Sequence, residues 1–138
     1  MARVPSLYLL LLLALAYRLA VVALLELASS LVPLFDPTPD GLLARSSRLQ
    51  PFVRWDVLWF VPVALRGRYA TEQETAFGWG WLGTMRALGG VVWRLRTGEG
   101  GGGGGLTVED VVLGGMAGSW LAGLAATALL YECVPRLL

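Results

Sequence analysis

The sequence predicts an all-α membrane protein in which two transmembrane helices flank a long loop with short interfacial helices. Two observations lead to this prediction: the 138 residues are 56% hydrophobic, and the apolar residues concentrate in two runs near the ends of the sequence. About 20 apolar residues cross the hydrocarbon core of a bilayer, and both runs reach that length. We therefore divide the chain into four segments: residues 1–35 (tail and first transmembrane helix), 36–97 (loop), 98–106 (glycine-rich linker) and 107–135 (second transmembrane helix).

The first apolar run, Leu7 to Leu25, also has features of a secretory signal peptide. Arg3 precedes the run, and Ala14-Leu15-Ala16 has the small residues of a cleavage site. A signal peptide should turn polar after its cleavage site, whereas residues 19–25 remain as apolar as those before them. We therefore expect an uncleaved transmembrane helix.

Arg18 lies in the middle of this first run, where a charged side chain costs on the order of a few kcal/mol. One interpretation is snorkelling, or partial burial against a neighbouring helix. The other is pairing with an acidic or phosphate group inside a helix bundle. The residues leave both open.

The second apolar run begins with Glu109 and Asp110, which suit the first turn of a helix because the helix dipole favours negative charge there. A stripe of small residues follows, which predicts close packing against another transmembrane helix. Its members are Gly114, Gly115, Gly118, Ser119 and Gly123.

The loop opens with FDPTPDG, residues 35–41, whose two prolines and glycine should end the first helix. A helix can begin at Asp56, with an apolar body that Pro62 bends. Trp55 and Trp59 are four residues apart and would share one face of that helix, the arrangement expected at a membrane interface.

The rest of the loop predicts further short elements. Thr71 and Glu74 have the spacing of a capping box. Residues 82–98 have the pattern of an amphipathic helix, and the glycines of 98–105 predict a flexible spacer rather than a phosphate-binding loop, since no Gly-Lys-Ser/Thr follows. The polar side of the amphipathic helix would carry Arg86, Arg94 and Arg96.

The composition excludes several kinds of chemistry. The chain has no histidine and one cysteine, so Ser-His and Cys-His nucleophile pairs, His-ligated metals and Cys-clustered zinc are excluded, and we expect no metal and no cofactor. The net charge is +1, which gives no support for nucleic-acid binding. Any chemistry must therefore rest on carboxylates, arginines and backbone groups.

An ordered set of loop residues resembles the glycosylphosphatidylinositol (GPI) mannosyltransferases that add the second mannose. The set comprises Trp55-Asp56, Trp59-Phe60, Gly67-Arg68-Tyr69, Glu72-Gln73-Glu74 and Ala76-Phe77-Gly78-Trp79-Gly80-Trp81. The chain departs from the family in two places: Arg68 interrupts a Gly-Tyr pair, and Pro62 enters a helix that usually lacks proline. Family members are also several hundred residues long, so the resemblance implies an amino-terminal fragment, which we expect to be inactive alone.

The resemblance implies a GT-C-type polytopic enzyme of the endoplasmic reticulum membrane. Its donor would be dolichyl-phosphate mannose, which places the loop in the lumen, and its acceptor the mono-mannosylated GPI precursor, extended through an α-1,6 linkage. The other expected partners are membrane lipids and a small membrane subunit.

Transfer from a β-linked lipid phosphate to an α-mannoside inverts the anomeric carbon and needs a carboxylate base. Asp56 is the candidate, because it follows the first membrane helix, where a lipid-linked donor would present its sugar. Its alternative role is a helix N-cap or a partner of Arg54. The candidate substrate-binding residues are Arg54, Trp55, Trp59, Glu72 and Glu74. The alternatives are interfacial anchoring for the tryptophans, lipid headgroup contacts for the arginines, and structural or solvated positions for the glutamates.

Two other functions stay open at this point. One is a non-enzymatic two-span accessory subunit of a membrane complex, which the small-residue stripe supports. The other is a different lipid-phosphate-sugar-dependent glycosyltransferase, because the acceptor is implied by the resemblance alone.

Overall fold

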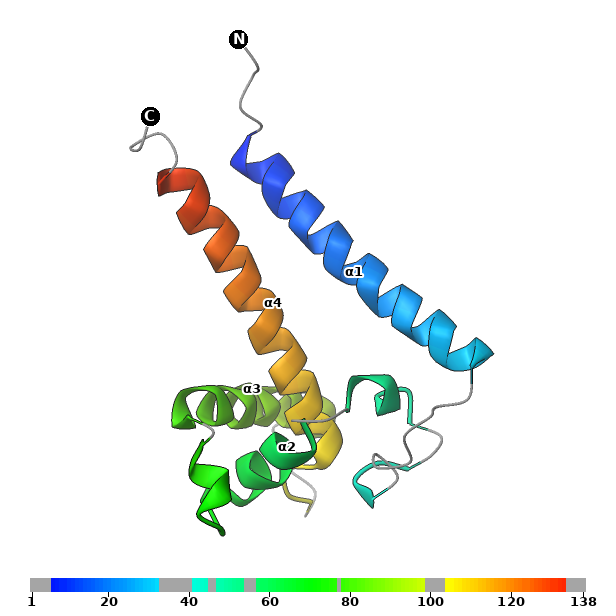
Figure 1. Cartoon of the computed structure of the whole chain (residues 1–138), viewed down its shortest axis with the longest axis vertical. Helices are drawn as coiled ribbons and strands as arrows, with labels where there is room; N and C mark the ends of the chain where they lie inside the picture. The colour runs from blue at the N-terminus through cyan, green and yellow to red at the C-terminus, as the bar shows by residue number, and fades with distance from the viewer. Residues whose placement is uncertain are drawn as a thin grey trace. The chain divides into compact units, whose positions relative to one another are not determined.

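The computed structural model describes residues 6–32, 41–44, 47–53, 57–76, 78–98 and 104–133 (Figure 1). These ranges contain helices and no strand, which confirms the all-α class. The helices are α1 (Leu7–Leu31), η2 (Gln50–Phe52), α2 (Val57–Arg66), η3 (Gln73–Ala76), α3 (Trp79–Thr97) and α4 (Val108–Cys133), where η denotes a short 3-10 helix. The chain divides into two compact units, residues 1–31 with 119–138, and residues 32–118.

Helices α1 and α4 are the two elements long and apolar enough to cross a membrane, by length and composition, among the described residues. They contain 25 and 26 residues. At 1.5 Å per residue each is roughly 37–39 Å long, more than the roughly 30 Å of a hydrocarbon core. The two apolar runs are therefore confirmed as long helices.

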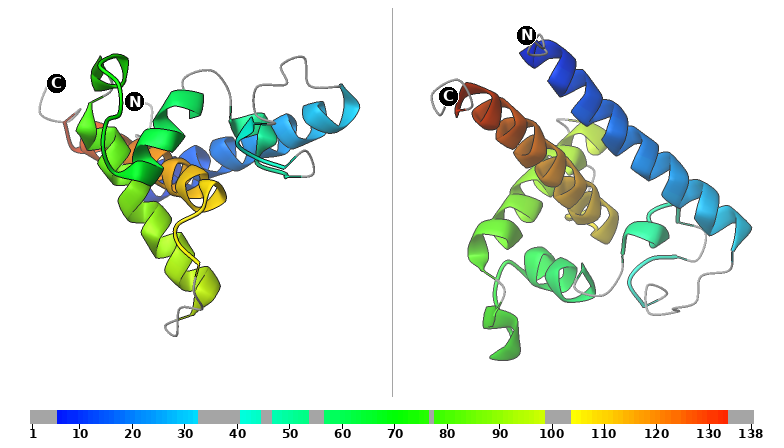
Figure 2. Two further views of the ribbon diagram at one scale, coloured as in Figure 1. Left: turned by 90° about the horizontal axis from the view of Figure 1, so that it is seen from below. Right: turned by 45° about the horizontal axis from the view of Figure 1, so that its top comes forward.

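In the unit formed by residues 32–118, α2 packs against α3, and the first turns of α4 lie with them, as Figure 2 also shows. Helix α2 buries Val61, Val63 and Ala64 and leaves Trp59 53% exposed. It continues past Pro62 to Arg66, so the proline does not end the helix. The core of this unit consists of Leu43, Val53, Val61, Ala64, Met85, Val111 and Val112.

The backbones of α3 and α4 touch where two glycines face each other. A Cβ atom on Gly114 would lie 2.6 Å from the carbonyl oxygen of Met85 and 2.8 Å from the Cα of Gly89. A Cβ atom on Gly89 would lie 3.0 Å from the carbonyl oxygen of Asp110. The first part of the small-residue stripe thus has a different partner from the one predicted, because it packs against the amphipathic helix α3 and not against a second transmembrane helix.

In the other unit, the second part of the stripe accommodates Arg18 of α1. Nη1 of Arg18 donates a hydrogen bond of 3.5 Å to Oγ of Ser119. A Cβ atom on Gly123 would collide with the guanidinium group, lying 2.7 Å from its Cζ. Arg18 therefore packs against a neighbouring helix, as one of the two interpretations of this residue expected.

Candidate functional site

The resemblance places the candidate site on the segment that runs from Trp55 through α2 to the start of α3. Asp56, the predicted base, lies outside the described residues, as do Arg54 and Trp55. Helix α2 begins at Val57, so Asp56 directly precedes the first turn of a described helix. The other candidates, Trp59, Glu72 and Glu74, lie within the described ranges.

Glu74 is buried, with 6% of its surface exposed, and its carboxylate is fully engaged by protein donors. Nη2 of Arg66 lies 2.6 Å from its Oε1. Its Oε2 accepts hydrogen bonds from the backbone N–H groups of Ala70, at 2.7 Å, and Thr71, at 3.4 Å. The hydrogen bond from Ala70 and the one from Arg66 lower the pKa of Glu74 below its usual value. Glu74 is therefore a stable anion that ties the α2–α3 connection together.

The predicted spacing of a capping box at Thr71 and Glu74 corresponds to part of this arrangement. The Glu74 side chain reaches back to the Thr71 backbone N–H, as the acidic member of a capping box does. The element that follows is the 3-10 helix η3. The sequence spacing located this local contact, whereas the ion pair with Arg66 was not predicted.

Arg86 of α3 holds the carboxyl-terminal end of α2. Its Nη1 donates to the carbonyl oxygens of Ala64, at 2.8 Å, and Leu65, at 2.5 Å, two of the groups that a helix end leaves without partners. The guanidinium lies beside Gly67, which has φ +67°, and a Cβ there would come within 3.1 Å of its Cζ. Arg86 is exposed, as expected for the polar side of α3, and the structure adds a specific contact to the end of α2.

Three tryptophan side chains of α2 and α3 are exposed. Trp59 of α2 and Trp79 and Trp81 of α3 all present large exposed surfaces. Trp79 also meets Tyr69 edge to face, with ring centroids 4.9 Å apart. Trp59 is thus accessible for either of its predicted roles, contact with a substrate or anchoring at an interface.

Glu72 differs from Glu74 in its surroundings. It is exposed, and its carboxylate has no hydrogen-bond or ion-pair partner among the described residues. Arg68, which interrupts the family pattern, is exposed as well. Of the two glutamates in the Glu-Gln-Glu motif, Glu72 is the one whose side chain is free to meet a ligand.

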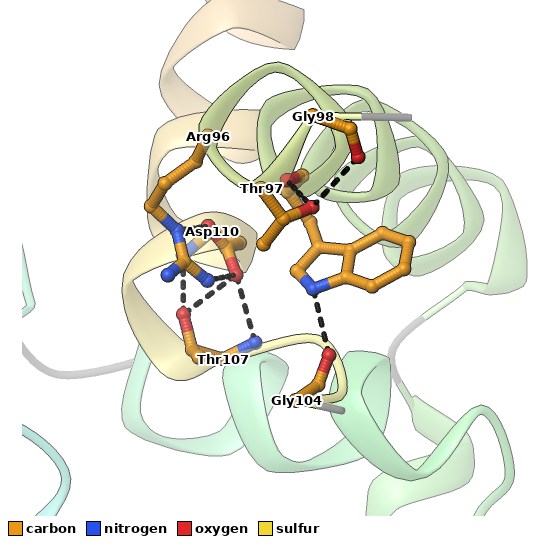
Figure 3. Close-up of polar contacts among 7 residues, drawn as sticks. Arg96, Thr97, Gly98, Gly104, Thr107 and Asp110 are labelled. Atoms are coloured by element: carbon orange, nitrogen blue, oxygen red, sulfur yellow. Dashed lines mark hydrogen bonds and ion pairs between the residues drawn. The ribbon is translucent and has the colours of Figure 1, made fainter. Parts of the chain in front are cut away.

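A second polar cluster joins the end of α3 to the start of α4 (Figure 3). Asp110, with 1% of its surface exposed, accepts hydrogen bonds from Nε of Arg96 at 3.1 Å and from Nη2 at 2.9 Å. Its Oδ2 also accepts from the backbone N–H of Thr107 at 2.9 Å and from the Thr107 hydroxyl at 2.7 Å. The hydrogen bonds from Arg96 to Asp110 raise the pKa of Arg96.

Thr107 and Asp110 also cap the first turn of α4 reciprocally. The backbone N–H of Asp110 donates to Oγ1 of Thr107 at 3.3 Å, while the Asp110 carboxylate accepts from Thr107. Nε1 of Trp93 donates to the carbonyl oxygen of Gly104 at 2.9 Å, which anchors the end of the glycine-rich linker (Figure 3). The Thr-x-x-Asp spacing was readable in the sequence, but the partner Arg96, across the linker, was not.

The described carboxylates of residues 57–118 therefore differ in availability. Glu74 and Asp110 are held in ion pairs, and Glu109 accepts a 3.2 Å hydrogen bond from the Ser47 hydroxyl. No group of three or more Asp, Glu or Cys side chains that could hold a metal ion occurs in the part of the chain that the structure describes. Among the described carboxylates of this segment, Glu72 is thus the one left unengaged for a reaction that needs a carboxylate base, while Asp56 lies outside the described residues.

Comparison with known proteins supports the resemblance. The chain is similar to two curated proteins named GPI mannosyltransferase 2, from Cryptococcus neoformans var. neoformans serotype D, strains JEC21 and B-3501A. Each is 36% identical to it over 132 residues, which cover 96% of this chain and 29% of the relative. The chain thus spans under a third of the length of these relatives. No family model matches the chain, and no solved structure matches it.

Proposed function

We propose that this chain, a relative of GPI mannosyltransferase 2, forms part of an enzyme that transfers the second mannose in GPI-anchor biosynthesis. The observation that carries the proposal is the 36% identity across 96% of the chain, which includes the loop motif. The donor is dolichyl-phosphate mannose, the acceptor is the mono-mannosylated GPI precursor, and the new linkage is α-1,6. The enzyme is a GT-C-type, multi-pass protein of the endoplasmic reticulum membrane, with residues 36–106 in the lumen.

The proposed reaction is a single inverting displacement. An acceptor hydroxyl attacks the anomeric carbon of the mannose, the bond to the dolichyl phosphate oxygen breaks, and the carboxylate of Asp56 takes the hydroxyl proton. The leaving phosphate keeps the electron pair of the broken bond. No metal is required for this step, provided that cationic side chains such as Arg54 steady the phosphate.

The environments of the described carboxylates argue against Glu74 and Asp110 as the base. A general base works best with a pKa near the working pH and with a free oxygen. Glu74 has a lowered pKa and donors on both oxygens, and Asp110 is buried in an ion pair. Glu72 is the alternative base, because its carboxylate is exposed.

Helix α2 provides a rigid support for a base at its amino-terminal end. Arg86 holds its carboxyl-terminal carbonyls, and the ion pair between Arg66 and Glu74 closes the connection that follows. Reactive groups held by packed helices keep their geometry better than groups on free loops, and small displacements cost catalytic rate. Glu74 therefore contributes to the site through support, while Trp55, Trp59 and Glu72 remain the proposed contacts to donor sugar or lipid.

A chimaera tests the proposed function directly. Residues of this chain replace the matching 132 residues of a GPI mannosyltransferase 2 relative, and the chimaera is expressed in cells that lack the enzyme. The proposal predicts restored display of GPI-anchored proteins and loss of accumulated mono-mannosylated precursor, whereas the 138-residue chain alone should restore neither. A chimaera that is made at normal abundance but leaves the precursor unprocessed would contradict the proposal.

A further inference from the structure

Arg18 has a position in α1 that snorkelling does not explain. It lies 11 residues after the start of the helix at Leu7 and 13 residues before its end at Leu31 (18 − 7 and 31 − 18). At 1.5 Å per residue these separations correspond to about 16 Å and about 20 Å. Arginines reach the headgroup region from positions near helix ends, so Arg18 lies too deep to place its charge there.

The contacts of Arg18 leave most of its hydrogen-bonding capacity unused. A guanidinium has five N–H donors, and the one polar contact that Arg18 makes in the described structure is the 3.5 Å hydrogen bond to the neutral hydroxyl of Ser119. No carboxylate pairs with it among the described residues, although Glu26 and Glu132 are described. A charge at this depth is stable only with a partner, since lipid supplies none.

Gly123 makes room for the guanidinium on α4. Any side chain at this position would collide with Arg18, so the glycine leaves room for the guanidinium beside Ser119. The remaining donors can then form the planar, bidentate contact that guanidinium groups make with carboxylates.

We propose that Arg18 is the cationic half of an intramembrane ion pair, whose anionic half is an Asp or Glu side chain on a further membrane helix that packs against α1 and α4. Depth argues for a carboxylate rather than a lipid phosphate. Phosphates lie outside the hydrocarbon core, about 15 Å from its midplane, whereas Arg18 lies near the middle of its helix. The inference depends on α1 crossing the membrane and not on the proposed chemistry.

The test compares Arg18→Met with Arg18→Lys in the whole protein. Methionine keeps the length of the side chain and removes the charge, while lysine keeps the charge. The ion pair predicts that Arg18→Met lowers steady-state abundance several-fold and that Arg18→Lys retains most of it. Arg94→Met is the matched control, because Arg94 is an exposed arginine of α3 outside the two membrane-length helices, and it should leave abundance unchanged.

A methionine variant as abundant as the unchanged protein, or more abundant than the lysine variant, would overturn the proposal, because deleting an unpaired intramembrane charge should favour insertion.

A suppressor screen identifies the partner. In the Arg18→Met background, substitutions that restore abundance should neutralise one Asp or Glu in a membrane helix, because that carboxylate is the group left unpaired. A suppressor in the same polypeptide assigns the partner helix to the enzyme itself, and one in another gene assigns it to a second subunit. Suppressors confined to non-acidic positions would refute a carboxylate partner.

Discussion

Adjacent glycines on α3 provide a matched pair of substitutions for testing the contact between α3 and α4. Gly89 faces α4, where an added Cβ would lie 3.0 Å from the carbonyl oxygen of Asp110 and 3.1 Å from the Cα of Val111. Gly90, the next residue in the same helix, would place a Cβ with nothing within 4 Å. Gly89→Ala and Gly90→Ala therefore add the same methyl group to a crowded and to an open position.

An added methyl group has two opposing effects on stability, a gain in helix propensity and a cost of overpacking. Replacing a glycine with alanine inside a helix stabilises it by about 0.5–1 kcal/mol, which is the full effect expected at Gly90. At Gly89 the neighbours are backbone atoms that cannot rotate away, so the alanine also incurs an overpacking cost of about 1–3 kcal/mol. The two variants should therefore differ by about 1–3 kcal/mol, with Gly89→Ala the less stable.

The assay is thermal unfolding of the protein purified in detergent. Since about 1 kcal/mol shifts Tm by roughly 2–4 °C in proteins of 150–250 residues, we expect a gap of several degrees between the variants. Gly90→Ala should unfold at or above the temperature of the unchanged protein. Equal Tm values for the two variants would refute the close crossing of α3 and α4.

Three further predictions concern the loop and the whole chain. Because the pKa of Glu74 is lowered, its stabilising contribution is present above the ordinary glutamate pKa of 4.5 and is lost as pH falls below that value. The Glu74→Gln variant should therefore unfold more easily than the unchanged protein near neutral pH, and this difference in stability should shrink in acid. A difference in stability that does not depend on pH would contradict this prediction. Glycosylation-acceptor tags near Arg45 and near Gly102 should both be modified in microsomes, whereas unmodified tags that a cytosolic reagent reaches would reverse the topology. The 138-residue chain by itself should transfer no mannose from dolichyl-phosphate mannose, and measurable product would refute that expectation.

The helices could be predicted from the sequence because their signals are local. The two apolar runs became α1 and α4, and the amphipathic pattern of residues 82–98 became α3. Helix α3 starts earlier than predicted, at Trp79, so the last tryptophans of the family motif lie on a helix rather than in a loop. Gly78 and Gly80, which precede and separate these tryptophans, made a helix start here hard to predict, since glycine lowers helix propensity.

The contacts that fix the loop could not be predicted, because they join residues far apart in the chain. The pairing of Arg86 with the carbonyls at the end of α2, and of Arg96 with Asp110, depends on how the helices cross. The sequence pattern predicted only that each arginine lies on the polar side of α3. The same limit applies to the glycine stripe, whose composition predicted close packing without identifying α3 as the partner.

The two glutamates of the Glu-Gln-Glu motif have different surroundings. The sequence made Glu72 and Glu74 equal candidates for substrate contact. In the structure they differ, since Glu74 is buried and hydrogen-bonded to protein donors, whereas Glu72 is exposed. That separation follows from the position of Arg66 at the end of α2, which no local pattern encodes. The assignment of Asp56 remains a proposal that depends on the resemblance and on reaction chemistry.

The Asp56→Asn substitution in the active chimaera tests the central claim most directly. Asparagine keeps the size and capping ability of the side chain, so abundance should change little, but it cannot accept the acceptor proton. The measurement is the rate of mannose transfer to the mono-mannosylated precursor, normalised to abundance, with Glu72→Gln, which alters the alternative base, measured in parallel. We predict a loss of roughly 100-fold or more for Asp56→Asn and a much smaller loss for Glu72→Gln, which removes a proposed substrate contact. Normal transfer by Asp56→Asn together with a large loss in Glu72→Gln would contradict the account and move the base to Glu72.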